Sequence, residues 1–467
     1  MSIKVSELLA AYPEDNSNER QLIERQIEQV LSTLSHRQIP ISAFRRAWSL
    51  GGLHMNVGLA YTAYWIRGWF SNSDEKKRKL LETHLRSAVK LLAEMGYLRG
   101  AVMKVGQTIA NYPDILPDEF VETLSRLHFD APPMRYSLLR EYLRNELGGD
   151  PEELFDSFET NAFAAASLGQ VHRARLKTGE QVAIKIQYPG IGKTIRSDFR
   201  TLSAAMFPMR LTKSWDALKA SLDEAARVLE LETDYEKEAE TLTRARKLFH
   251  EDDGIVVPRI HERYCTPRVL TMEYIDGVHI APFLSQNRTQ EVRDEFGRKI
   301  HLAVMRLDGA RMMYADPHPG NFLFLEDGRL GLLDFGCVRP YSDGEWQYYR
   351  KIKLNPSREE LLQAMIDSGA AVEGEAVDPG FFQYFETMYR WTQEPVVTDG
   401  PFDFGDAQKM RVGFDGIAEC MRKRYVGGKP MFLFMYRCFF GVRAMLYRLR
   451  AKVDVKTLYE QENKNIK

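Results

Sequence analysis

Three polar side chains in the second half of the chain have the types and spacing of a phosphoryl-transfer site. Asp316 and Asn321 bracket the segment Asp316-Pro-His-Pro-Gly-Asn321, and Asp334 opens Asp334-Phe-Gly shortly afterwards. A carboxylate such as Asp316 could orient or deprotonate an attacking hydroxyl, whereas the oxygens of Asn321 and Asp334 are hard ligands that suit Mg²⁺. The spacing therefore predicts a catalytic aspartate followed by two magnesium ligands.

The segment between the two ligands predicts a hairpin that brings them together. Apolar residues at 322–324 and 330–333 flank Asp327-Gly328, a dipeptide typical of tight turns. Asp-Phe-Gly alone occurs in many unrelated proteins, and Asp-Pro-x-Pro-Gly is also an ordinary loop sequence. Joined at this spacing, the two pieces match the two halves of the protein-kinase signature, which favours a kinase-like site.

Composition excludes several classes of partner and setting. The 467 residues carry 64 basic and 65 acidic side chains, so no overall field attracts nucleic acid, and no such partner is expected. The four cysteines lack paired spacing, which argues against zinc and disulfides and favours a reducing cytoplasm. No secretory signal or spanning segment is evident; residues 50–70 predict a core helix, with peripheral membrane contact as the alternative.

Breaks in the pattern predict four parts and an α+β fold. Pro40 ends a helical segment over residues 1–40, and Gly148-Gly149 ends a helical extension over 41–150. Residues 151–277 then predict a small, β-rich kinase-like lobe, and residues 278–467 a larger helical lobe. The whole is expected to form a two-lobed, protein-kinase-like fold.

A second block of chemistry lies between residues 158 and 187, which read as strand, loop, strand, turn and strand. Its last strand, Val182-Ala-Ile-Lys185, has the kinase arrangement in which a lysine holds nucleotide phosphates. Alanines stand where kinases keep a glycine-rich loop; their N–H groups still reach phosphate, but their methyl groups narrow the space. An exposed lysine on an ordinary hairpin is the alternative. The predicted nucleotide contacts are Ala164, Ala165, Ala166, Ser167, Leu168, Gly169, Gln170 and Val171.

Acidic residues on a long helix, predicted over 214–249, supply partners for cations. Glu232 and Glu238 are six residues apart and would project about 120° from each other on one helix. They could thus serve Lys185 and Lys104, although most acidic residues on such helices are simply solvated. Further on, Glu273 to Ile275 follow a strand and precede Asp-Gly, as in the hinge whose backbone binds adenine.

These motifs, in this order, resemble the UbiB family, also called the AarF or ADCK family, of atypical kinase-like proteins linked to coenzyme Q biosynthesis. The resemblance covers about residues 40 to 450. It depends on four hallmarks, namely Lys104-Val-Gly-Gln107, the Ala164–Ser167 loop, Glu232-Thr-Asp234 and Asp316-Pro-His-Pro-Gly-Asn321. The first and third of these are absent from ordinary protein kinases.

The resemblance implies ATP and Mg²⁺ as cofactors and assigns roles to the motifs. Lys185 would contact the phosphates and pair with Glu238. A lid of Lys104, Gln107, Glu232 and Asp234 would fold over the site, with Lys104 meeting Glu232 and displacing any peptide substrate. This chain departs from many relatives at Gly169, where alanine is common and glycine would make the loop more permissive, and at Tyr314, where histidine is common. Bacterial relatives often end in two spanning helices, which are not evident here.

Three functions remain open on these residues. The first is an ATP-dependent kinase-like enzyme or ATPase that supports quinone or isoprenoid-lipid metabolism, with a lipid or quinone-precursor ligand. The second is a small-molecule phosphotransferase, since His318 stands where protein kinases keep a lysine and no Ala-Pro-Glu follows Asp334-Phe-Gly. The third is a scaffold that senses nucleotide with negligible turnover.

Overall fold

The structure is a computed structural model that describes residues 134, 136–166, 168–191, 223, 230, 232–315, 317–423 and 430–465. The predictions for residues 1–133, including Lys104 and Gln107, lie outside the described residues, as do Ser167 and Asp316. The described residues fall into two compact units, of which the second comprises 180–182, 234–265 and 270 onward. The predicted four-part division of the chain stays a prediction.

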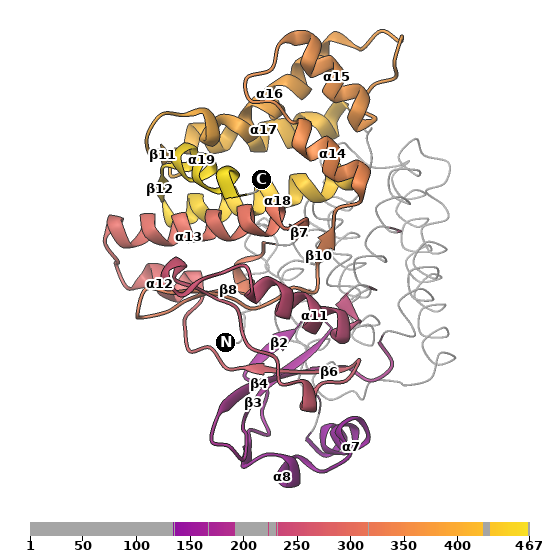
Figure 1. Ribbon diagram of the computed structural model, residues 1–467, viewed down its shortest axis with the longest axis vertical. Coiled ribbons are helices and arrows are strands. Elements are labelled where there is room, and N and C mark those ends of the chain that lie inside the picture. Colours follow the sequence, from indigo (N-terminus) through magenta and orange to yellow (C-terminus); the bar gives the residue numbers. More distant parts are fainter. Residues whose placement is uncertain are drawn as a thin grey trace, which may run out of the picture. The chain divides into compact units, whose positions relative to one another are not determined.

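A sheet of short strands follows the helix at the start of the described chain (Figure 1). Its strand order is β1-β3-β4-β6, and β2 pairs with β3. Antiparallel register sets Ala164 against Val171 and Ala166 against Gly169. The two strands predicted around the turn at 177–180 are confirmed, but the predicted alanine loop is wrong in part, because Ala164–Ala166 form strand β2. The strands are β1 (Ser157–Phe158), β2 (Ala164–Ala166), β3 (Gly169–Arg175), β4 (Gln181–Gln187) and β6 (Val269–Glu273).

Helix α7 (Tyr136–Leu147) buries one face and stops at glycine. Leu139 and Leu143, one turn apart, are buried, whereas most other positions of the helix meet solvent. Gly148 takes the left-handed conformation, φ 79°, and donates to the carbonyl of Arg144. The predicted helix end at Gly148-Gly149 is confirmed, and the short helix α8 (Pro151–Leu154) follows.

The second unit is built around the buried helix α13 (Gln290–Gly309), which Thr289 caps by accepting from the N–H of Val292. Strand β7 (Met312–Tyr314) follows and pairs with β10 (Val338–Pro340). A second small sheet has the order β5-β9-β8. Its strands are β5 (Ile255–Val256), β8 (Phe322–Phe324) and β9 (Leu330–Leu332).

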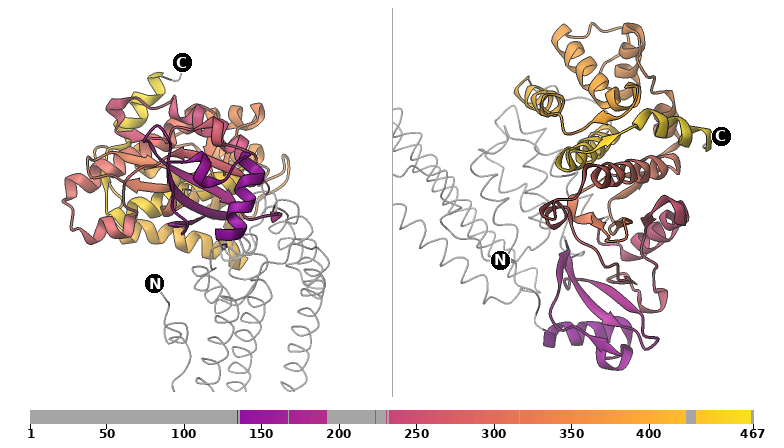
Figure 2. Two further views of the ribbon diagram at one scale, coloured as in Figure 1. Left: turned by 90° about the horizontal axis from the view of Figure 1, so that it is seen from below. Right: turned by 90° about the vertical axis from the view of Figure 1, so that its left-hand side faces the viewer.

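Helices make up most of the remaining chain, and α18 lies beside α13 (Figures 1 and 2). The apolar residues of α18 and α19 join one core with α13, β7, β8 and β9, as predicted for the larger lobe. Phe382 and Phe385 of α16 pack with α15 in a separate cluster, and Trp391 of α16 packs with Met410 of α17 in another. No helix among the described residues is long and apolar enough to span a membrane. The elements are α12 (Ile280–Ser285), α14 (Asp343–Lys351), α15 (Arg358–Ser368), α16 (Pro379–Val397), β11 (Phe402–Asp403), α17 (Ala407–Lys423), α18 (Pro430–Leu449), β12 (Lys452–Val453) and α19 (Val455–Asn465).

The predicted continuous helix over 214–249 is wrong at its centre. Helix α11 spans only Tyr235–Arg246, and Thr233 lies in a turn before it. Asp234 has a non-helical backbone and accepts from the N–H of Lys237, so it caps a new helix start. Glu232 and Glu238 therefore belong to different segments, and the 120° projection along one helix does not apply.

Candidate functional site

The hairpin between the two predicted magnesium ligands is confirmed. Strands β8 and β9 pair antiparallel with Phe322 opposite Leu332, and Gly328 turns the chain with φ 86°. Beyond the last strand pair, the N–H of Leu333 donates to the carbonyl of Asn321 at 2.9 Å. Asn321 and Asp334 consequently lie at the same end of the hairpin.

The backbone of the Asp334-Phe-Gly segment is held on both sides. Asp334 accepts from the N–H of Gly336 through Oδ1 at 2.9 Å, and its carbonyl accepts from the Tyr314 hydroxyl at 3.0 Å. Phe335 is fully buried, with its ring centroid 5.7 Å from that of Tyr314. A carboxylate has about four lone-pair sites, so Asp334 retains capacity for a cation after this bond. Hard oxygens on Asn321 and Asp334 fit Mg²⁺, which proteins commonly hold with one or two side chains plus phosphates.

His318 has a defined tautomer. Its Nδ1 accepts from the N–H of Gly320 at 3.0 Å, which caps the short turn Pro319–Asn321. An accepting Nδ1 is unprotonated, so the ring carries its proton on Nε2 in the neutral form. The side chain is exposed. Sequence reasoning treated this residue only as a replacement for lysine and did not anticipate its capping role.

Glu238 lies on the buried face of α11 and is 2% exposed. Tyr235 and Leu242, three residues before and four after it, are buried in the core that also contains Phe335. A carboxylate in such a setting requires a cation or hydrogen-bond donors. Glu238 therefore has the environment of a paired residue, which an exposed helix face would not provide.

At the predicted hinge, the carbonyl of Glu273 and the N–H of Ile275 point to the same side of the backbone. Glu273 donates its N–H to the carbonyl of Arg259 at 2.8 Å, but Arg259 returns its N–H to the Glu273 carboxylate at 3.2 Å. Tyr274 donates to Gln181 on the opposite side. In the described part of the chain, no protein hydrogen bond engages the carbonyl of Glu273 or the N–H of Ile275. Alternation along extended backbone directs these two groups to one side.

The hairpin formed by β2, which consists of three alanines, and β3 is packed more tightly than predicted. A Cβ atom on Gly169 would lie 2.1 Å from the carbonyl oxygen of Ile186 on β4. The N–H of Tyr188 also donates to the carbonyl of Leu168 at 3.0 Å. Gly169 thus allows two strands to approach closely, which corrects the expectation that it makes the loop more permissive.

The side chains of Leu168 and Gln170 point into the protein, so only their backbone could face a nucleotide. Gln170 is 1% exposed; its Oε1 accepts from the N–H of Met134 at 2.8 Å, and its Nε2 lies 2.7 Å from Nε2 of His172. His172 Nδ1 in turn lies 2.8 Å from the carbonyl of Glu159. Burial lowers the pKa of His172, so the neutral ring donates through Nδ1 and accepts through Nε2. This buried chain was missed, because its partners are distant in sequence.

Lys185 and the Glu232 segment lie near the same end of β4. Lys185 is 9% exposed, and alternation places it on the strand face that also carries Gln187. Gln187 donates through Nε2 to the carbonyl of Thr233 at 2.6 Å, and Thr233 is the neighbour of the buried Glu232. The structure therefore brings the Glu232-Thr-Asp234 motif close to the strand of Lys185.

Comparison with known proteins identifies the family. The sequence profile of the ABC1 atypical kinase-like domain matches residues 126–360, about half of the chain. The chain belongs to the ABC1 atypical kinase-like family. This confirms the UbiB/AarF/ADCK resemblance and the predicted α+β kinase-like fold.

The ABC1-family chain is similar to proteins from animals and bacteria. AarF domain-containing kinase 1 of Drosophila melanogaster is 33% identical over 58% of this chain and 52% of its own length. The mitochondrial atypical kinase COQ8B of Danio rerio is 31% identical over 73% of this chain and 56% of its own length. The chain thus spans about half the length of these curated relatives. A solved Rv3197–erythromycin complex from Mycobacterium tuberculosis is 30% identical, with a TM-score of 0.54, and covers 84% of this chain and 98% of that one.

Proposed function

We propose that this ABC1-family chain binds ATP with Mg²⁺ and transfers or hydrolyses the terminal phosphate, in support of quinone or isoprenoid-lipid metabolism. The β8–β9 hairpin carries the proposal, since it holds Asn321 and Asp334 at one end. These residues would hold Mg²⁺, which when bound neutralises charge on the transferring phosphate. Asp316 is proposed to orient the attacking hydroxyl and accept its proton.

Adenine is proposed to bind the hinge. The carbonyl of Glu273 would accept from the adenine amino group, and the N–H of Ile275 would donate to a ring nitrogen. Two observations support this proposal: Arg259 bonds the Glu273 side chain in place of its carbonyl, and Ile275 packs with Leu323 and Leu325 of the hairpin region. The apolar contact would hold the hinge backbone in register with β8.

The phosphates are proposed to meet Lys185 and the backbone of residues 164–171. Lys185 would pair with Glu238, whose burial requires a compensating partner. Lys104 and Gln107 stay proposed lid residues, with Glu232 as the partner of Lys104. Asp234 would contribute by starting the helix that carries Glu238, because its carboxylate caps α11.

The phosphoryl acceptor is proposed to be water, a lipid or a small molecule. After Gly336 the chain enters β10 almost at once, and Tyr341 donates its N–H to the carbonyl of Arg311 before α14 begins. This short, paired connection leaves little chain for a peptide-binding platform. The erythromycin named with the mycobacterial relative supports including bulky small molecules among candidate ligands.

Phosphate release from ATP by the purified full chain with Mg²⁺ tests the proposal. It is measured alone, with anionic liposomes, and with a phenolic quinone-precursor analogue. We expect turnover in the wild type, loss of turnover with retained ATP binding in Asp316→Asn, and loss of Mg²⁺-dependent turnover in Asp334→Asn. Stimulation by liposomes would support peripheral membrane contact.

The nucleotide-sensing scaffold is the second candidate, because alanines replace the flexible glycines of kinase phosphate loops. ATP binding without phosphate release under every supplement would overturn catalysis and support this scaffold. Release that persists in both aspartate variants would overturn the assigned site itself.

A further inference from the structure

Helix α18 lies directly against the loop that carries Asp316. A Cβ atom on Gly441 would stand 2.5 Å from Cγ and 3.2 Å from Cδ of the buried Pro317, and 3.3 Å from its carbonyl oxygen. Real Cβ atoms do not approach other heavy atoms so closely, so any larger residue at position 441 must displace Pro317 or the helix by roughly 1 Å. The backbone of α18 therefore packs directly against Pro317, the residue that follows Asp316 in the chain.

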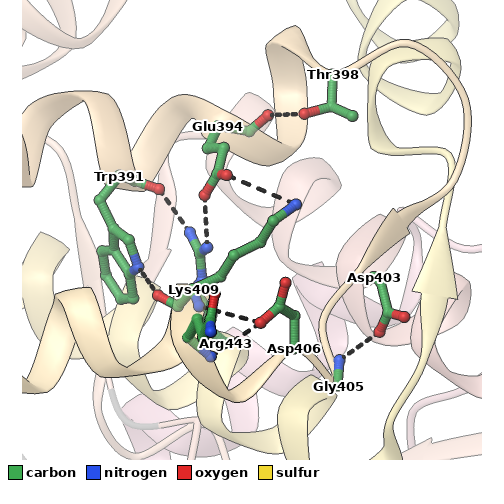
Figure 3. A network of polar contacts seen from close by, with 9 residues as sticks. Trp391, Glu394, Thr398, Asp403, Gly405, Asp406, Lys409 and Arg443 are labelled. Atoms are coloured by element: carbon green, nitrogen blue, oxygen red, sulfur yellow. Dashed lines mark hydrogen bonds and ion pairs between the residues drawn. The ribbon is translucent and has the colours of Figure 1, made fainter.

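Helix α18 is held in place by the side chain of Arg443, two residues after Gly441. Arg443 is 5% exposed and donates to the carbonyl of Trp391 at 2.5 Å and to the Glu394 carboxylate at 3.0 Å. Its guanidinium lies 4.1 Å from the centroid of the Trp391 ring. Trp391 donates its indole N–H to the carbonyl of Lys409, so α16, α17 and α18 are tied together (Figure 3).

The strand that precedes the loop is also held in place. Residues 312–314 form β7, which pairs with β10 and packs against α18. Tyr314 is bonded to the backbone of Asp334. Pro317 thus follows a paired strand in the chain and contacts an anchored helix, and its ring limits the backbone freedom of the loop.

We propose that Gly441 is a positioning residue for the catalytic loop: by admitting Pro317 against α18, it sets the position of the backbone that follows Asp316 in the chain. The proposal rests on the proposed function for its kinetic consequence, and on the packing alone for its structural consequence. A misplacement of about 1 Å costs up to about a hundredfold in rate when a reacting group is moved.

The variant Gly441→Ala tests the proposal against the matched variant Gly297→Ala. A Cβ on Gly297 of α13 would lie 2.6 Å from Cβ of Ala451, a similar clash that does not involve Pro317. We expect both variants to lose thermal stability. Only Gly441→Ala should lower kcat for ATP, by about tenfold to a hundredfold, while its ATP affinity stays within about twofold of wild type.

Hydrogen exchange of the backbone over residues 312–322 supplies a readout that needs no turnover. It should change in Gly441→Ala and stay unchanged in Gly297→Ala. If the wild type releases no phosphate, a selective exchange change still supports the positioning role while the proposed function fails.

A second-site variant completes the test. Pro317→Ala removes the two ring atoms that meet the added methyl group, so Gly441→Ala/Pro317→Ala should be no slower than Pro317→Ala alone. The proposal is overturned by wild-type kcat and exchange in Gly441→Ala, by equal effects in Gly297→Ala, or by additive losses in the double variant.

Discussion

The hydroxyl of Tyr314 donates to the backbone carbonyl of Asp334 at 3.0 Å, which links the strand before the catalytic loop to a proposed magnesium ligand. A ring contact adds to this link, because the ring of Tyr314 packs edge-on against the ring of the buried Phe335, the residue after Asp334. The phenol of Tyr314 thus connects β7 to the segment that carries Asp334.

Tyr314→Phe removes that hydrogen bond and keeps the ring. A bond of this kind contributes about 0.5–1.5 kcal/mol, so the Mg²⁺ concentration for half-maximal ATP turnover should rise about two- to tenfold. Magnesium titration of phosphate release measures the effect. An unchanged magnesium requirement would show that the link is dispensable.

Asp334→Asn should remove the magnesium dependence of nucleotide binding with little loss of stability. Its amide oxygen can still accept from Gly336, but the negative charge is gone. Calorimetric ATP titration with and without Mg²⁺ measures this. The control is Asp327→Asn at the opposite end of the same hairpin, which should bind Mg–ATP like the wild type; an equal loss in both variants would contradict the site.

Two substitutions of His318 separate its ring nitrogens. Asn can replace the Nδ1 acceptor that caps Gly320, whereas Gln places a donor near Nε2 without that cap. If His318 is structural, Asn retains turnover and Gln loses it. If Nε2–H contacts the phosphates, Gln retains more turnover than Asn. Thermal unfolding of both variants shows whether the cap itself was lost.

Gly169→Ala should destabilise the protein by about 1–3 kcal/mol, because its methyl group meets a backbone oxygen that cannot turn away. Denaturant unfolding measures the loss. Gly344→Ala on α14 is the control, since a Cβ there has open space and alanine favours a helix by up to about 1 kcal/mol. Equal stability of Gly169→Ala and wild type would mean that β3 shifts freely.

The free energy of unfolding should fall as pH rises toward neutrality, because the buried Asp308 loses its proton. This side chain lies at the end of α13, where the Tyr341 hydroxyl donates to it at 3.0 Å, and burial raises its pKa to about 7. Between about pH 4 and pH 7 the folded state binds this proton and the unfolded state releases it, so deprotonation costs up to about 4 kcal/mol of stability.

Asp308→Asn resembles the protonated acid and removes this penalty. The variant should unfold at a higher temperature than wild type at pH 8, and the difference should shrink at pH 5. Thermal unfolding across that range measures it. A difference that is the same at both pH values would contradict the raised pKa.

Local signals in the sequence were sufficient to predict the β8–β9 hairpin and the strands β3 and β4. Asp327-Gly328 specifies its own turn, and the apolar runs before and after it specify the two short strands β8 and β9, whose residues are all buried. The helix stop at Gly148 is likewise local, because glycine accepts a positive φ without strain. Each of these features depends on residues within one turn or one strand pair.

The tertiary structure alone decided where distant segments meet. The need for glycine at 169 comes from the backbone of Ile186 on another strand. Gly441 meets Pro317 across more than a hundred residues of chain. Helical and strand periodicities indicate which face of an element is buried, but they carry no information on which residues of another element contact that face. Those contacts are decided by the close packing of side chains in the folded protein.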